Sequence, residues 1–154
     1  MIRIKDEELC TIDVEWYGID KKGNVAVFCS AGEANVPEFV CVDKKRYEEL
    51  VYLFDKLPVV SDTLICFKPC KKNHLHIEVA ETYSNKGIYY DADDNSKSEK
   101  NICVCQEYYT INSKPLSPIK YSDLPIKIQE LLKDNFLDID DFENEPVIKI
   151  KNAY

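Results

Sequence analysis

Two cysteines and two histidines lie within eleven residues of one another and are the strongest candidates for chemistry. Cys66, Cys70, His74 and His76 carry the soft or borderline ligand atoms that zinc accepts. Structural zinc sites usually separate two ligand pairs by about a dozen residues or more, whereas these pairs almost touch. Two interpretations stay open: a small metal- or cysteine-dependent enzyme centred on these residues, or cysteines beside a proline turn followed by a strand with its histidines toward solvent.

Two further motifs lack residues that their chemistry requires. The segment Cys29-Ser30-Ala31-Gly32 resembles a nucleophile turn, but no glycine precedes the serine to permit the sharp elbow. The segment from Asp91 begins like a calcium loop, yet Ser96 replaces the expected glycine and Ile102 replaces the chelating glutamate. We therefore expect a non-catalytic protein without a cofactor or a bound metal.

Length and composition predict one domain, spanning residues 1–154, with an ordinary globular core. Hydrophobic residues make up 45% and charged residues 31% of the chain. The seven cysteines are an odd number, and several lie inside apolar runs, which is typical of reduced core thiols. The N-terminal residues turn acidic where a secretory signal would stay apolar, and no apolar run is long enough for a membrane. We expect a cytoplasmic protein that does not enter the membrane.

The elements that would position any site follow from hydrophobic periodicity. Residues 12–16 alternate like a half-exposed strand, and Asp20-Lys-Lys-Gly-Asn24 forms the turn of a hairpin to a fully apolar strand over 25–30. Asp43 is a suitable N-cap for a helix over 44–57. Further strands are expected over 75–79, 87–91, 102–111 and 147–150, with a second helix from Ser122, carrying Pro125 in its first turn, to about Asn135.

Hairpins combined with two separated helices predict an α+β fold. The sheet is expected to be mainly antiparallel, built from hairpins, with the two helices packed on one of its faces. A doubly wound parallel fold would need strands and helices in strict alternation, and this chain lacks that order.

Charge and aromatic content favour protein binding. The formal net charge of −8 opposes binding to nucleic acid and suits a basic protein partner. Ten tyrosines and one tryptophan supply amphipathic side chains of the kind that interfaces use, although most are expected in the core. A subunit of a larger assembly is a further alternative. The predicted partner-binding residues are the acids of two segments: Asp91, Asp93, Asp94, Asp138, Asp140, Asp141 and Glu143.

An ordered set of short motifs adds a resemblance. These motifs are Trp16 to Asp20 with Gly23 to Phe28, Gly87 to Asp91, Pro115-Leu116, and Asp123 to Pro125. The set resembles small uncharacterised bacterial proteins, some of which are similar to immunity proteins of polymorphic toxin systems. The resemblance spans roughly residues 16–132 and implies a stoichiometric inhibitor that neutralises a toxin domain. It implies no catalytic residue.

Overall fold

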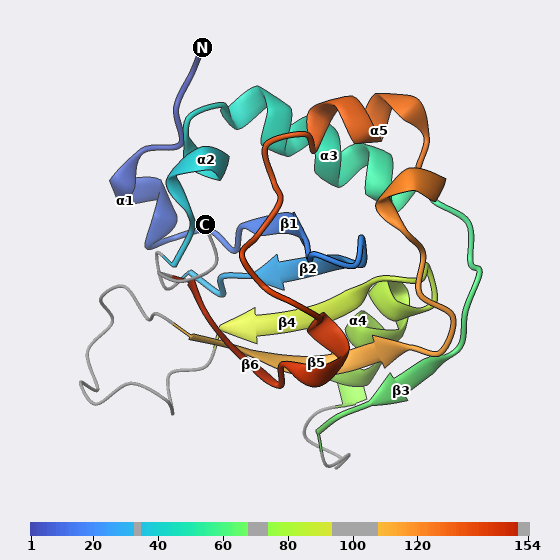
Figure 1. Cartoon of the computed structure of the whole chain (residues 1–154). Helices are drawn as coiled ribbons and strands as arrows, with labels where there is room; N and C mark the ends of the chain where they lie inside the picture. The colour runs from blue at the N-terminus through green and yellow to red at the C-terminus, as the bar shows by residue number, and fades with distance from the viewer. Residues whose placement is uncertain (33–34, 68–73, 94–107, 151–154) are drawn as a thin grey trace.

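The fold is organised around one curled sheet of six strands. The structure is a computed structural model and describes residues 1–32, 35–67, 74–93 and 108–150. The strand order is β1-β2-β4-β5-β3, and β6 pairs with β5 on the same side as β3. The pair β2 and β4 is parallel, and the other pairs are antiparallel. The mainly antiparallel α+β prediction is confirmed (Figure 1). The strands are β1 (Glu15–Ile19), β2 (Val25–Cys29), β3 (Thr63–Ile65), β4 (Tyr89–Asp93), β5 (Tyr108–Pro115) and β6 (Val147–Lys149).

The predicted hairpins are present. Strands β1 and β2 pair from Glu15 with Cys29 to Ile19 with Val25, and Gly23 takes the left-handed conformation that the turn requires, with φ of 82°. Strands β4 and β5 form the second antiparallel pair. Of the strand predicted over 102–111, residues 102–107 lie outside the described residues, and β5 continues past 111 to Pro115. The alternation predicted over residues 12–16 is present, since Val14 and Trp16 are buried while Asp13 is exposed and Glu15 is half-buried, but β1 is buried on both faces from Trp16 to its end at Ile19.

Helices account for the largest difference from the predicted elements. Helix α3 begins after Asp43, whose side chain accepts a hydrogen bond from the Arg46 amide as a cap should. Residues 75–79, predicted as a strand, belong to α4, and buried Ala80 and Ser84 on that helix are four residues apart. Helix α5 begins after Pro125, so Pro125 precedes its first turn. The helices are α1 (Asp6–Leu9), α2 (Glu38–Cys41), α3 (Lys44–Asp55), α4 (His74–Ser84) and α5 (Ile126–Leu131), with short 3-10 helices η3 (Tyr121–Asp123) and η4 (Phe142–Asn144).

Alternation along β1 and β2 divides the apolar side chains between two cores. Tyr17 and Val27 face a core that contains Leu50 and Phe54 of α3 together with residues of α4 and α5. The Tyr17 and Phe54 rings stack with their centroids 3.8 Å apart. Trp16 and Phe28 face the opposite core, which the N-terminal residues, α2 and the C-terminal segment cover. The sheet is therefore covered on both faces.

The C-terminal segment, residues 135–150, joins the two edges of the sheet. At its start the Ile19 amide donates to the Asn135 carbonyl at 3.0 Å, and the Leu137 amide donates to the Ile19 carbonyl at 2.8 Å. The Asn135 side-chain amide also donates to the Tyr17 carbonyl at 2.8 Å. The segment then crosses one face of the sheet and ends as β6 beside β5 (Figure 1). It closes the free edge of β1 and carries four of the predicted site residues with it.

Candidate functional site

The turn between β1 and β2 is tied to the C-terminal segment by a buried carboxylate. Asp20 is 1% exposed, and its Oδ1 accepts from the amides of Lys22 at 2.9 Å and Asn24 at 2.8 Å. Its Oδ2 accepts from the Asn24 side chain at 3.0 Å and from the Phe142 amide at 2.9 Å. Hydrogen bonds to a buried carboxylate are strong, so the turn and η4 hold one fixed position relative to each other.

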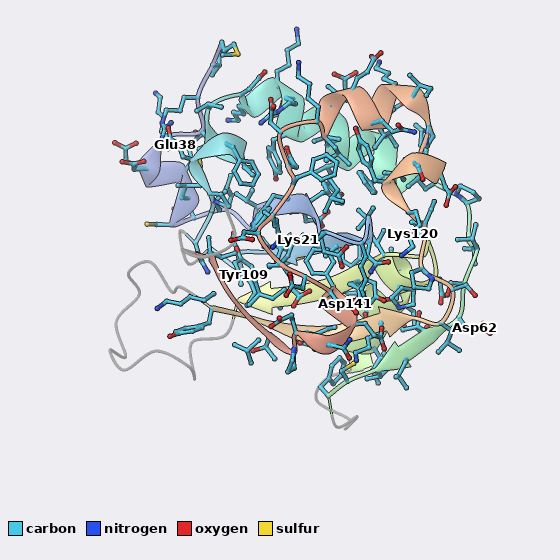
Figure 2. The ribbon with its side chains drawn as sticks, viewed as in Figure 1. Lys21, Glu38, Asp62, Tyr109, Lys120 and Asp141 are labelled. Atoms are coloured by element: carbon cyan, nitrogen blue, oxygen red, sulfur yellow. The ribbon has the colours of Figure 1, made fainter. Side chains whose placement is uncertain are left out.

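Two of the predicted acids project from this segment toward solvent. Leu137 and Ile139 are buried, while Asp138 and Asp140 between and after them are exposed, which is the alternation of an extended chain lying on a core. The Lys21 ammonium lies 2.8 Å from Asp138 and 3.3 Å from Asp140. Its hydrogen bond lowers the pKa of the Asp138 carboxyl. Two exposed carboxylates thus share the ammonium of Lys21, the residue labelled in Figure 2.

The next two predicted acids, Asp141 and Glu143, make more contacts than Asp138 and Asp140 do. Asp141 is the N-cap of η4, and its carboxylate accepts from the Glu143 amide at 3.0 Å and from the Lys22 ammonium at 2.8 Å. The ammonium is the main cause that lowers the pKa of Asp141. Glu143 accepts from the Tyr89 hydroxyl at 2.8 Å and lies 3.5 Å from the Lys114 ammonium. Burial, and then Glu143, raise the pKa of the Tyr89 hydroxyl, so Tyr89 stays a neutral donor.

The structure places the predicted partner-binding residues in different environments. Asp138, Asp140, Asp141 and Glu143 lie along one segment, with Asp141 mostly buried and the other three exposed. Asp91 is not at the surface: it is 0% exposed in the middle of β4, so it cannot contact a partner. This corrects its assignment, which took a polar residue near a loop to be exposed. The backbone of Asp93 pairs in β4, and Asp94 lies outside the described residues.

The cysteine and histidine cluster receives a different geometry from the one its sequence suggested. Cys66 follows β3, and burial raises the pKa of its thiol, which disfavours the nucleophilic thiolate. Positions 74 and 76 belong to α4, and residues two apart on a helix do not share a face. His76 is exposed, and Cys70 lies outside the described residues. Within the described part of the chain, no three histidine, cysteine or acidic side chains are grouped as metal ligands.

Sequence reasoning missed the residues that position the acids. Lys21 and Lys22 lie in the predicted turn, and Lys114 lies beyond the strand predicted over 102–111, yet each contacts an acid of the C-terminal segment. The turn motif was a signal for Asp20, because aspartate at that position commonly bonds the following amides. The bond from the Phe142 amide had no local signal, since it joins positions 122 residues apart.

Comparisons with known proteins give no relative to guide the assignment. No family model, no curated protein and no solved structure matches this chain. Among the described helices, none is long and apolar enough to cross a membrane.

Proposed function

We propose that this protein is a non-catalytic module that binds a basic protein, and specifically an immunity protein that neutralises a bacterial toxin domain. The observation that carries the proposal is the pair of exposed carboxylates on Asp138 and Asp140, which share the single ammonium of Lys21. Among the described residues no second ammonium forms an ion pair with these two carboxylates, so the pair keeps a negative charge that a cationic side chain of a partner would complete.

The rigidity of the supporting segment favours this use. Buried Leu137 and Ile139 anchor the exposed acids from below, and the Lys21 amide donates to the Ile139 carbonyl at 2.9 Å. Side chains on a fixed backbone lose less conformational entropy when they bind than side chains on a free loop. The net charge of −8 adds long-range attraction toward a basic cleft.

A cytoplasmic location is part of the same proposal. The four described cysteines, Cys10, Cys29, Cys41 and Cys66, are free thiols, as a reducing compartment would keep them. An inhibitor in this compartment would meet a toxin domain after its entry or before its export.

The test measures binding to the basic products of neighbouring genes. The full chain is mixed with each purified basic domain, and a one-to-one complex is sought by calorimetry at low and high salt, together with protection of cells that express the domain. A double variant, Asp138→Asn with Asp140→Asn, is expected to slow association about tenfold, because charges at the rim of an interface act mainly on the association rate.

A charge-matched control separates this surface from the overall charge. The double variant Glu48→Gln with Asp55→Asn removes two exposed acids of α3, on the helix-covered face of the sheet. It is expected to leave association close to that of the wild type. Equal slowing by both double variants would contradict the assignment of the surface, and no complex and no protection with any basic neighbour would contradict the function.

A further inference from the structure

A groove of about 390 Å³ lies beside the acidic segment, where β5 ends near the turn between β1 and β2. Its walls come from β3, β5, the segment after β5, the turn and η4. Two exposed leucines line it, Leu64 and Leu116, with 51% and 63% of their surface exposed. The groove is also lined by three lysines, Lys22, Lys114 and Lys120.

Lys120 differs from the other two lysines in its partner. Lys22 and Lys114 are paired with Asp141 and Glu143, as described above. The Lys120 ammonium donates instead to the neutral Asn24 side-chain oxygen at 2.7 Å. Among the described residues that line the groove, Lys120 is the lysine that makes no ion pair with a carboxylate.

A buried relay holds this ammonium in place. Asn24 is 4% exposed, and its own side-chain amide donates to the buried Asp20 carboxylate at 3.0 Å. The Lys120 backbone also forms a bridge with Asn24, so both ends of the residue are fixed against the turn. A cation oriented in this way binds an incoming anion with little loss of side-chain entropy. Lys120 and Asp141, the N-cap of η4, both line the groove and are labelled in Figure 2.

The two exposed leucines indicate that the ligand carries an apolar side chain next to its anionic group. Leu64 is the central residue of β3 and pairs with Lys114 of β5, and Leu116 is the residue directly after β5. Both leucines therefore lie near the same end of β5. Leu116 exposes most of its surface to water and Leu64 about half, and both lie beside the ammonium groups. An apolar side chain laid on them would remove that area from water.

We propose that this groove binds a peptide segment of a partner protein in which an acidic side chain neighbours an apolar one. The carboxylate meets the Lys120 ammonium, and the apolar side chain packs on Leu64 and Leu116. The charges select against a basic segment, because three ammonium groups line the groove and its two carboxylates are already paired with lysines. This site is separate from the exposed pair Asp138 and Asp140 and does not depend on a toxin partner.

The experiment titrates the isotopically labelled full chain with two blocked hexapeptides and follows backbone amide shifts. One peptide alternates glutamate and leucine between terminal serines, and the other has lysine in place of each glutamate. The acidic peptide is expected to shift amides of β3, of residues 114–120 and of the turn over 22–24. The basic peptide is expected to leave them unchanged.

Variants test the contacts that the proposal names. Lys120→Gln is expected to weaken binding of the acidic peptide about tenfold, the size of one charge-assisted hydrogen bond. Leu64→Ser is expected to weaken it about threefold through lost apolar contact. The control Lys127→Gln removes an exposed lysine of α5 that pairs with Glu49, and it should bind like the wild type. No shift with either peptide, equal shifts with both, or equal loss in Lys120→Gln and Lys127→Gln would overturn the proposal.

Discussion

Replacing Asp91 with asparagine should remove a pH-dependent loss of stability that is built into the centre of the sheet. Asp91 lies opposite Phe28 of β2 and Ile111 of β5 and is 0% exposed. Among the described residues, neither of its carboxylate oxygens has a hydrogen-bond partner. Burial therefore raises the pKa of this carboxyl well above its ordinary value. The folded protein keeps a proton on Asp91 that the unfolded chain releases above about pH 4.

The sign and slope follow from that difference in bound protons. Between the unfolded and folded pKa values the folded state holds more protons, so the free energy of unfolding falls as the pH rises. The loss is about 1.4 kcal/mol for each pH unit in this window, and it stops once the pH passes the folded pKa. The stabilising contribution of the neutral carboxyl is fully present only below the unfolded pKa.

The assay is urea unfolding followed by the fluorescence of Trp16, the single tryptophan, at several pH values from 4.5 to 7. Asparagine replaces the neutral carboxyl with another buried polar group of similar size, and because asparagine does not titrate, the stability of the variant carries no pH dependence from this position. The difference between variant and wild type should therefore change with pH by about 1.4 kcal/mol per unit. The exposed-acid control Asp55→Asn should show no such change, and a flat difference for Asp91→Asn would refute the reasoning.

Three further predictions concern the C-terminal segment. Lys21→Gln should raise the pKa of the Asp138 carboxyl toward its ordinary value, because the lost ammonium is what lowers it; carbon-detected NMR titration would show this, and an unmoved pKa would contradict the pairing. Gly18→Ala should cost about 1–3 kcal/mol in chemical unfolding, since a Cβ there would lie 2.5 Å from Leu137 Cδ1 inside the core; an unchanged midpoint would be the contrary result. Asn135→Ala should cost about 1–3 kcal/mol by leaving a β1 carbonyl without its donor, and native-state hydrogen exchange should speed up along that edge rather than stay as in the wild type.

Local signals predicted the elements that local chemistry determines. The Asp43 cap and the apolar spacing that follows it defined α3 almost to the residue, and the turn from Asp20 to Asn24 defined the first hairpin. The strand predicted over residues 75–79 is wrong, because an alternation of five residues fits the period of a helix as well as that of a strand. These residues belong to α4, which packs against the sheet. Burial of β1 on both faces depends on α3 and on the C-terminal segment, which no local pattern in the strand reveals.

The candidate site, like the fold, could be predicted from the sequence only in part. The acids at 138–143 are a charged run in the sequence, and the exposure of Asp138 and Asp140 follows their alternation with buried Leu137 and Ile139. Their partners were not visible, because Lys21 lies more than a hundred residues away in the chain. Asp91 was misplaced because an acid in a strand is usually exposed, and only the three-dimensional stacking of β2, β4 and β5 shows that it is enclosed.

The C-terminal segment, residues 135–150, crosses the sheet, and this has a consequence for the order of folding. The hydrogen bond between Asn135 and Tyr17 closes a loop of 118 residues, and contacts of such separation form late and slow the overall rate. Until they form, the edge of β1 is unpaired and one apolar face is open to aggregation or to chaperones. Because the exposed acids lie on the same residues, we expect the proposed binding surface to form late in folding. A partner that recognises it would thereby select completely folded molecules.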